Sequence, residues 1–376
     1  MKIKIAHVAG GLTTGGVEAV VYNYFSHMPR EDYELYYISY DTPNEQVKAR
    51  FEALGFHVYE VCKKKDNFIK SCRQVLDILK ENDIQIIHSH MTLVCFITAI
   101  LARMCGVKVC IAHSHLAQNI TGIKKYVYGV FKWLTKLTAS DCFACGNEAG
   151  IYLYGKKAFE NGQVVMMHNA IDIQKYGFCE QTRREVREEL KAQDSFCIGQ
   201  VGRFTEQKNH TFLLDIMSEI VKVKDNAKLF LFGEGPLEEE IREKVQRLSL
   251  QEHVVFMGSV TNMDRYYPAM DVFLLPSLYE GLAVSLVEAQ CSGLPVVTSD
   301  TVTEEIKLSH KYDVLALTQN PAKWAKAVCK YEQSKESAER LEERQQAKFL
   351  IEEHGYNIQK EAEKIDRFYK NAVGQR

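Results

Sequence analysis

The sequence of 376 residues lacks the features of a membrane-spanning, secreted or disulfide-stabilised protein. Its longest apolar run, Met91–Ala102, is too short to cross a bilayer and is typical of a buried helix. The opening residues, Met1–Ile5, predict a strand and no signal peptide. The eleven cysteines show none of the spacing of a small disulfide-rich domain, which favours free thiols in a reducing cytoplasm. We therefore expect a cytoplasmic globular protein, long enough for two domains with full cores.

Motifs for nicotinamide and metal chemistry are also missing. The N-terminal glycines match neither Gly-x-Gly-x-x-Gly nor a Walker loop, and the missing dinucleotide fingerprint disfavours a hydride-transfer enzyme. No Asp-x-Asp occurs, so a diphosphate would be held by Arg, Lys and helix dipoles instead of carboxylate-bound Mg²⁺. Cys142 and Cys145 have no second cysteine pair at metal-site spacing, so we favour a core position for them over zinc or redox chemistry.

Short apolar runs alternate with helical stretches along the chain, which predicts α/β domains whose parallel sheets are covered on both faces. In the first half, the expected strands are Ile3–Ala9, Glu34–Ser39, His57–Val61, Ile84–His88, Lys108–Ala112, Cys142–Cys145 and Val164–His168. In the second half, they are Phe196–Val201, Lys228–Phe232, Val254–Met257, Val272–Leu275, Pro295–Thr298 and Val314–Ala316. The charged stretch Glu180–Lys191 precedes the second series, and Asn169–Phe178 is the expected junction. The pattern predicts two doubly wound units in tandem.

A glycine-rich loop follows the first expected strand. Four of the seven residues from Gly10 to Gly16 are glycine, and Val17–Phe25 has the apolar spacing of a helix. Gly15 and Gly16 lack a Cβ atom, so a ligand can approach their backbone closely. A plain strand-to-helix turn is the alternative, but four glycines exceed what such a turn needs. We therefore expect a ligand at this loop.

The stretch Tyr279–Ala289 lies between the apolar run Asp271–Leu275 and a helix expected from Val284 onward. A helix that begins at a glycine-containing loop presents N–H groups and a positive dipole end, which suit a phosphate. Glu280 lies in the loop. Glu288, about one turn inside the helix, is placed to accept hydrogen bonds from hydroxyls of the same ligand. The stretch predicts a site for a phosphorylated, hydroxyl-rich ligand such as a nucleotide sugar.

Other polar residues also follow expected strands, where parallel α/β sheets bind their ligands. Arg203 and Lys208 lie in the loop after the strand that opens the second series, and Gly233 follows the next strand. A guanidinium and an ammonium together can neutralise a diphosphate. Two solvated loop cations are the alternative interpretation. The placement of Arg203 and Lys208 favours a binding role.

Two His-Ser-His sequences follow neighbouring strands of the first series and contain His88, His90, His113 and His115. Zinc is conceivable there, but no carboxylate or cysteine stands at ligand spacing beside them, and the two pairs need not converge. A single histidine at the end of an apolar run is more often a hydrogen-bonded structural residue. We favour a hydrogen-bonding role in a ligand cleft for His113 and leave His115 open.

Five segments in this order resemble the retaining glycosyltransferases of family 4, which have the GT-B fold. They are the N-terminal glycine loop, Gly202–Lys208, Phe232–Pro236, Phe256–Gly258 and Pro276–Ala289 with its Glu-x7-Glu spacing. The resemblance covers nearly the whole chain. The Gly-Gly-Val-Glu sequence and the His-Ser-His segments look like those of the bacterial capsule and exopolysaccharide branch.

The resemblance implies the GT-B architecture: two doubly wound Rossmann-like domains that face each other across a cleft, with a C-terminal helix crossing back to the first. An N-terminal acceptor domain would comprise residues 1–172 with helix 356–376, and a donor domain residues 173–355. The expected activity is that of a retaining hexosyltransferase.

The resemblance also implies roles for single residues. Glu288 would bind the donor ribose, Glu280 would contact the transferred sugar, and Gly16 would approach the donor from the other domain. The active-site histidine would be His113, or His115 if the loop is offset. The expected catalytic residues are His113, Glu280, Arg203 and Lys208, and the expected donor-binding residues are Gly15, Gly16, Arg203, Lys208, Gly233, Leu282, Ala283, Val284 and Glu288. No metal and no other cofactor is expected.

The implied donor is a nucleotide diphosphate sugar, first of all a UDP-sugar carrying a hexose or N-acetylhexosamine. The implied acceptor is a saccharide or an undecaprenyl-linked glycan, and no nucleic acid partner is expected. A helix over Thr121–Thr138 combines lysines with aromatic residues, and basic residues outnumber acidic ones in the first 170 residues. Peripheral contact with the inner membrane face would fit, whereas an ordinary helix with a solvated lysine face is the alternative.

Two other functions fit the same plan. A nucleotide-sugar epimerase or hydrolase would release epimerised or free sugar without an acceptor. A catalytically silent partner subunit would be expected to lose site residues, whereas Arg203, Lys208, Glu280 and Glu288 are all present.

Overall fold

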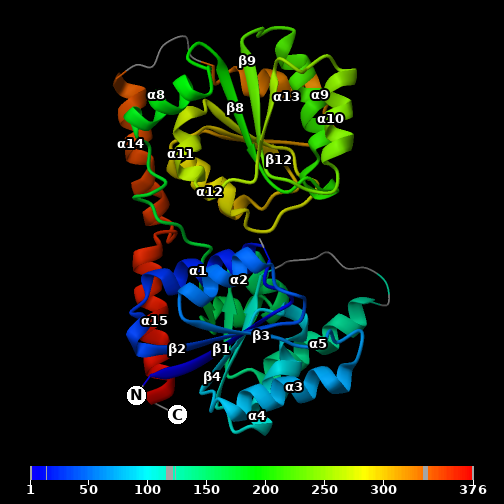
Figure 1. Cartoon of the computed structure of the whole chain (residues 1–376), viewed down its shortest axis with the longest axis vertical. Helices are drawn as coiled ribbons and strands as arrows, with labels where there is room; N and C mark the ends of the chain where they lie inside the picture. The colour runs from blue at the N-terminus through cyan, green and yellow to red at the C-terminus, as the bar shows by residue number, and fades with distance from the viewer. Residues whose placement is uncertain (1, 14, 116–121, 123, 333–337, 375–376) are drawn as a thin grey trace. The chain divides into compact units, whose positions relative to one another are not determined.

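The computed structural model describes residues 2–13, 15–115, 122, 124–332 and 338–374. The chain divides into two compact units (Figure 1): unit 1 comprises Met1–Ala170 and Ile358–Arg376, and unit 2 comprises Ile171–Asn357. In each unit, helices pack against both faces of a parallel sheet, so each sheet has one hydrophobic core on either side. The doubly wound α/β class that the alternating pattern predicts is confirmed.

Unit 1 contains a seven-stranded parallel sheet in the order β3-β2-β1-β4-β5-β6-β7. Its strands are β1 (Ile3–Ala9), β2 (Tyr33–Ser39), β3 (Phe56–Glu60), β4 (Ile86–Ser89), β5 (Val109–Ser114), β6 (Asp141–Ala144) and β7 (Val164–Met166). The central strands are buried apolar runs, as a sheet covered on both faces requires. The strand order reverses between β1 and β4, and ligands of such sheets bind beside this switch point at the carboxyl ends.

The helices of unit 1 include the last one of the chain. They are α1 (Gly16–His27), α2 (Glu45–Ala53), α3 (Phe68–Glu81), α4 (Cys95–Met104), α5 (Lys124–Thr138), α6 (Asn147–Tyr154), α7 (Lys156–Glu160) and α15 (Ile358–Gly374), with 3₁₀ turns at Arg30–Asp32 and Thr92–Val94. α15 packs beside α1 (Figure 1) and buries Ile365 and Tyr369 against the sheet. Its packing partners come from the opposite end of the sequence.

Unit 2 contains a six-stranded parallel sheet in the order β10-β9-β8-β11-β12-β13. Its strands are β8 (Phe196–Val201), β9 (Ala227–Phe232), β10 (Val254–Gly258), β11 (Val272–Leu275), β12 (Val296–Ser299) and β13 (Tyr312–Leu315). Its helices are α8 (Glu180–Glu189), α9 (His210–Val221), α10 (Glu238–Arg247), α11 (Met263–Tyr266), α12 (Val284–Cys291), α13 (Pro321–Cys329) and α14 (Ala338–Glu353), with 3₁₀ turns at Glu206–Lys208, Tyr267–Ala269 and Glu304–Ile306. The strand order reverses between β8 and β11, so the loops after these two strands adjoin the switch point.

Two predicted helices begin later than the sequence suggests. The apolar run that starts at Met91 first forms a 3₁₀ turn, in which Thr92 has a φ of 45°, and α4 begins only at Cys95. The hydroxyl of Thr92 accepts a hydrogen bond from the backbone of His115, which explains the local departure from a helix. The helix predicted from residue 121 begins at Lys124, and residues 121 and 123 lie outside the described part of the chain. Among the described residues, no helix has the length and hydropathy that a bilayer crossing requires.

Candidate functional site

The loop after β11 is held in place by hydrogen bonds to its backbone. The carbonyl of Ser277 accepts from Ser299 Oγ at 2.6 Å and from Thr301 Oγ1 at 2.7 Å. α12 begins a few residues later, with Ala283 at its N-cap and no side-chain capping bond there. No side-chain cap therefore competes with an anion for its N-terminal turn, where the positive end of the helix dipole lies.

Glu280 and Lys208 form a buried ion pair in unit 2. Lys208 Nζ lies 2.6 Å from Glu280 Oε1, and only 15% and 6% of the two side chains is exposed. Glu280 also accepts hydrogen bonds from Ser277 Oγ at 2.7 Å and from Gln207 Nε2 at 3.3 Å. The pair joins the loop after β8 to the loop after β11, so the predicted site residues Lys208 and Glu280 are in direct contact. Lys208 does not face solvent as an isolated cation.

Glu288 is half-buried on α12 and is held by two tyrosines. Its Oε2 accepts a hydrogen bond from Tyr267 OH at 2.8 Å, and Tyr176 also bonds to the carboxylate. Burial raises the pKa of Glu288, whereas the two hydroxyls and the nearby Lys175 oppose this rise. The tyrosines thus stabilise the ionised form, which is the form that accepts hydrogen bonds from ligand hydroxyls.

The side chain of Arg203 is exposed in the loop after β8 and, among the described residues, forms no hydrogen bond or ion pair, although its backbone carbonyl accepts from the N–H of Thr205 at 2.8 Å. The glycines beside it have a packing role. A Cβ at Gly233, whose φ is 139°, would lie 2.2 Å from the carbonyl oxygen of Gly202, and a Cβ at Gly235 would lie 2.5 Å from that of Phe204. Gly233 therefore allows the loops after β8 and β9 to touch. Its predicted contact with the donor stays a prediction.

In unit 1, the two glycines at the start of α1 differ in what surrounds them. A Cβ at Gly15 would lie 2.5 Å from Oε2 of Glu18, which folds back to accept a hydrogen bond from the backbone of Thr13 at 3.2 Å. A Cβ at Gly16 would meet no atom within 4 Å. A side chain at position 15 would therefore displace the end of the flexible Glu18 side chain, whereas position 16 borders open space, as close approach of a ligand would require.

Five histidines converge at the carboxyl ends of β1, β4 and β5, on the sheet face covered by α1 and α15. This histidine stack comprises His7, His88, His90, His113 and His115. It results from register: His7 pairs with His88 on the neighbouring strand, and every second residue of a strand points to the same face. The sequence does not show this convergence, although His7 interrupts an otherwise apolar strand.

Two hydrogen-bonded chains run through the histidine stack. In one, His90 contacts His7 (Nε2 to Nδ1, 3.0 Å) and His115 (Nδ1 to Nε2, 2.8 Å). In the other, His88 contacts Tyr369 OH at 2.7 Å and His113 (Nε2 to Nδ1) at 3.0 Å. His88 and His90 also stack, with ring centroids 4.5 Å apart and planes within 9°. The stack thus joins three strands to α15.

Burial keeps the stack neutral. It lowers the pKa of His7 to about 3 and that of His115 to about 4, and desolvation with neighbouring imidazoles lowers the pKa of His113 well below its usual range. His113 is fully buried, whereas His115 is only partly buried and lies where β5 enters its loop. His115 is thus the more accessible of the two histidines that the sequence suggests for the active site.

Ring nitrogens of two histidine triplets, His7–His88–His90 and His90–His113–His115, lie within 4.8 Å of one another. A metal ion needs lone pairs that converge on one point. Here the nitrogens of His90 point at His7 and His115 as hydrogen-bond partners, so a metal would have to break these bonds. The geometry is that of a hydrogen-bonded stack.

Comparison with known proteins identifies the family. The model described as Glycosyltransferase Family 4 matches residues 14–175, and the one described as Glycosyl transferases group 1 matches residues 195–333. EpsF of Bacillus subtilis (strain 168), assigned as a glycosyltransferase, is 31% identical over 334 residues, which cover 87% of each chain. The chain belongs to glycosyltransferase family 4.

This family 4 glycosyltransferase also resembles an Escherichia coli protein named UDP-Gal:alpha-D-GlcNAc-diphosphoundecaprenol alpha-1,3-galactosyltransferase, with 25% identity over 333 residues and 85% of each chain covered. Among solved structures, HepE of Anabaena in complex with UDP superposes with a TM-score of 0.77 at 16% identity, over 99% of this chain and 100% of that one. That likeness concerns the fold. The family and the GT-B fold implied by the sequence resemblance are confirmed.

Sequence reasoning missed the residues that support the predicted ones. Tyr176 and Tyr267, which hold Glu288, and Gln207 and Ser277, which bind Glu280, come from separate loops. No local motif marks the two tyrosines. The sequence offers one weak signal for these supporting residues, namely a polar residue close to a predicted site residue, such as Gln207 next to Lys208.

Proposed function

We propose that this glycosyltransferase moves a hexose or N-acetylhexosamine from a UDP-sugar to a lipid-linked saccharide, with retention of anomeric configuration, in capsule or exopolysaccharide synthesis. The observation that carries the proposal is the arrangement around α12, where an uncapped helix N-terminus lies in the same loop region as the Lys208–Glu280 pair and precedes Glu288 by one turn. The names of the relatives support the donor and acceptor classes, because they mention UDP and a diphosphoundecaprenol-linked glycan.

The diphosphate would bind at the N-terminus of α12, close to Leu282, Ala283 and Val284. In the transfer, the acceptor hydroxyl oxygen bonds to C1 of the sugar, while the bond from C1 to the phosphate oxygen breaks and its electron pair goes to the phosphate. The hydroxyl proton ends on the leaving diphosphate. Arg203, Lys208 and the helix dipole stabilise the charge that develops there, which is where preorganised donors contribute most.

The two carboxylates have different tasks. Glu288, held by its tyrosines, accepts hydrogen bonds from the ribose hydroxyls in its carboxylate form. Glu280 contacts the transferred sugar and keeps Lys208 in position. Glu280 is engaged by Lys208 and Glu288 by its tyrosines, and among the described residues no cluster that could hold a metal lies beside the α12 N-terminus, so we expect transfer without a divalent metal.

We assign the active-site role in unit 1 to His115, because His113 is fully enclosed in the histidine stack. His113 is then a positioning residue that acts through His88 and Tyr369. Gly16, which has open space beside its Cα atom, allows a ligand to approach α1.

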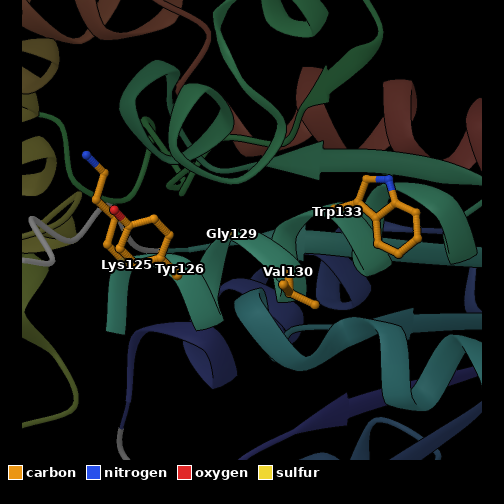
Figure 2. Close-up of a pocket in the computed structure, with 5 residues that line it drawn as sticks. All are labelled: Lys125, Tyr126, Gly129, Val130 and Trp133. Carbon is orange, nitrogen blue, oxygen red and sulfur yellow. The ribbon is translucent and has the colours of Figure 1, made fainter. Parts of the chain in front are cut away.

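A surface of α5 suits peripheral contact with an anionic membrane. Tyr126, Val130, Trp133 and Leu137 recur at helical spacing and are 77%, 53%, 59% and 61% exposed. A hollow of about 400 Å³ on this helix is lined by Lys125, Tyr126, Gly129, Val130 and Trp133. Figure 2 labels these five residues along α5. An apolar stripe with a lysine-rich end is the pattern of interfacial helices, and a lipid-linked acceptor needs such contact.

The lysines of α5 do not all belong to this surface. Lys132 Nζ lies 3.4 Å above the ring of Tyr152, and Lys136 Nζ donates to the carbonyl of Tyr154 at 2.9 Å. Both lysines hold α5 against α6. Lys124 and Lys125, which are exposed, are therefore the lysines that we assign to the membrane-facing surface. Vesicles of phosphatidylglycerol should sediment the wild type. The Tyr126→Ser/Trp133→Ser variant should stay in solution. Equal vesicle binding by the variant and the wild type would show that the apolar stripe of α5 is not the membrane-contacting surface.

The proposed function is tested first by donor binding. A thermal-shift panel of UDP-, GDP- and ADP-sugars, with and without EDTA, should show stabilisation by the UDP-sugars that EDTA does not remove. Radiolabelled transfer to a diphosphoundecaprenol-linked saccharide, with NMR of the new anomeric linkage, then tests acceptor and retention. Release of free or epimerised sugar at the same rate without acceptor would point to a hydrolase or an epimerase instead.

Site variants complete the test. Glu288→Ala and Arg203→Ala should abolish donor-dependent transfer without loss of folded structure. Glu239→Ala and Arg247→Ala are matched controls, since both side chains are exposed on or at the end of α10. Full activity of either site variant would refute the assignment.

A further inference from the structure

Unit 1 contains a buried cation that the proposed donor site does not use. Lys64 lies in the loop between β3 and α3. Its Nζ is shielded from solvent and has no hydrogen-bond partner among the described residues. Lys64 belongs to the end of the sheet where β2 and β3 terminate, on the face opposite to the histidine stack, because Tyr40 and Val61 pack in the core on the α3 and α4 side.

Lys64 is held above an aromatic ring. Its Nζ lies 4.2 Å from the ring centroid of Tyr40, which is 6% exposed, so the ring face contributes a cation–π attraction. The hydroxyl of Tyr40 is also buried and has no partner among the described residues. An ammonium with three donors and a phenol with one therefore lie side by side without an acceptor.

Within the described part of the chain, no anionic side chain pairs with Lys64. The acidic residue of the neighbouring loop, Asp41, is paired with Lys63 at 2.8 Å. The titratable groups that face Lys64 from the packed helices are Cys72 of α3 and Cys95 of α4, and burial raises the pKa of both thiols, so both are neutral at pH 7. Burying an ammonium without a counter-ion is costly, and the burial lowers the pKa of Lys64 to about 8. The Lys64 ammonium is thus buried without a counter-ion among the described residues.

The loops around Lys64 contact one another at the carboxyl edge of the sheet. The Lys63–Asp41 pair joins the loop after β3 to the loop after β2. The backbone N–H of Asp41 donates to the carbonyl of Gly10 at 3.0 Å, so the glycine-rich loop after β1 belongs to the same assembly. Three neighbouring strands thus contribute loops at the carboxyl edge of the sheet, which is where parallel α/β sheets bind ligands.

We propose that the Lys64 ammonium and the Tyr40 hydroxyl form an anion subsite of unit 1 that binds a phosphoryl group of the acceptor. This inference rests on the proposed function in one respect, namely that the acceptor carries a diphosphate. A compact ammonium beside a phenolic donor suits a tetrahedral oxyanion, which offers several acceptor oxygens to donors from different directions. The donor diphosphate has its own cations in unit 2, so the two anion sites should be separable by mutation.

The first test measures binding and does not depend on turnover. With the unit 2 site saturated by UDP, inorganic pyrophosphate is titrated into the wild type, Lys64→Gln and Lys65→Gln. Lys65 is the matched control, because it is the adjacent, exposed lysine of the same loop. We expect at least tenfold weaker binding to Lys64→Gln alone, and a smaller loss for Tyr40→Phe, which keeps the ring. Equal binding to Lys64→Gln and Lys65→Gln would overturn the subsite.

Proton uptake provides a readout that a merely structural lysine would not give. Because the pKa of Lys64 is about 8 in the free protein, a bound anion should raise it, and calorimetry at pH 8.5 in buffers of different ionisation enthalpy should show protons taken up with pyrophosphate. This uptake should disappear in Lys64→Gln. Lys64→Met, which keeps the stem over Tyr40, serves if Lys64→Gln proves unstable; uptake that persists in the variant would contradict the proposal.

Kinetics with two acceptors then separate the possible sources of the phosphoryl group. With a diphosphate-linked saccharide, Lys64→Gln should raise the acceptor KM at least tenfold and leave the donor KM unchanged. With the same saccharide on an uncharged alkyl chain, the variant should equal the wild type. An increase confined to the donor KM would assign Lys64 to the donor and refute the inference. If UDP itself fails to stabilise the protein, the proposed function fails, and the pyrophosphate titration without UDP still decides the subsite.

Discussion

The carboxyl ends of the two sheets use opposite electrostatic strategies. In unit 2, the loops around α12 bring together ionisable side chains: Lys208 pairs with Glu280, Glu288 is bonded by two tyrosines, and the side chain of Arg203 is exposed. In unit 1, the histidine stack contains five imidazoles that burial keeps neutral. The difference teaches that charged side chains are concentrated where the proposed function places a diphosphate, whereas the stack provides fixed hydrogen-bond directions without adding charge.

The largest predicted effect is a different acid sensitivity of the two units. A histidine whose pKa is lowered by folding takes up its proton on unfolding, so its contribution to stability is complete above about pH 6.5 and is lost as the pH falls toward 4. Each such histidine costs up to about 1.4 kcal/mol of unfolding free energy per pH unit. Native-state hydrogen exchange at pH 7 and pH 5 should therefore show a much larger loss of protection in unit 1.

Unit 2 is the internal control for this comparison, because among its described residues only His210 has a histidine pKa that is clearly lowered, to about 4. Peptides from β8, β9 and β11 should lose less protection than peptides from β1, β4 and β5. The same loss in both units would mean that the histidine stack does not dominate acid stability.

The second prediction concerns the ion pair of unit 2. Lys208→Met leaves the Glu280 carboxylate buried without its counter-ion, and urea unfolding should show a loss of about 3–5 kcal/mol in unit 2. Adding Glu280→Gln should restore most of this stability while transfer activity stays lost. Lys222→Met, which breaks the exposed pair with Glu219, should cost no more than about 1 kcal/mol. A stable Lys208→Met single variant would show that the pair has no structural role.

The smallest predicted effect concerns Glu288 and its support. Because burial raises the pKa of Glu288 and the Tyr267 hydroxyl opposes this, Tyr267→Phe should raise the pKa further. The carboxylate is the binding form, so the fall of kcat/KM for the donor on the acid side should begin at a higher pH. At neutral pH the donor KM should rise about fivefold, the equivalent of about 1 kcal/mol. Tyr331→Phe, which removes a hydroxyl from Asp313, should leave the profile unchanged.

Much of the fold was predictable because parallel strands buried on both faces are continuous apolar runs. Ile3–Ala9, Phe196–Val201 and Val272–Leu275 match the observed strands to the residue. The strand ends were less certain. The predicted strand Ile84–His88 is observed as Ile86–Ser89, since where pairing begins depends on the neighbouring strands, which no local pattern contains.

The site was predictable only as far as single loops reveal it. The strand–loop–helix pattern around Glu280 and Glu288 indicated a phosphate site, because glycine and helix position are local properties. The contact of Lys208 with Glu280 spans 72 positions in the sequence. Such a contact depends on the order β8-β11 in the sheet, and spacing along the chain cannot show it.

The histidine stack of unit 1 likewise depends on contacts between strands that spacing along the chain does not show. His88 and His113 are hydrogen-bonded because β4 and β5 are neighbours, and His7 joins them because β1 pairs with β4 in register. Four of the five residues stood out in the sequence as His-Ser-His repeats, but their convergence depends on sheet order. Lys132 and Lys136 lie in the lysine-rich helix of the sequence, but their contacts with α6 depend on how the two helices pack, which residue spacing does not show.

The chain of bonds His7–His90–His115 has a directional consequence. A neutral imidazole carries one N–H, so each histidine that donates through one nitrogen must accept through the other. If Nδ1 of His115 donates to a ligand, His90 must donate to His115 and His7 must donate to His90, which leaves Nε2 of His7 without a proton. A ligand that instead donates to His115 reverses all three rings. The tautomer of His7, whose ring is enclosed in the core, therefore depends on whether the ligand at His115 accepts or donates a hydrogen bond. Nitrogen-15 NMR of the His7 ring would show which tautomer is present.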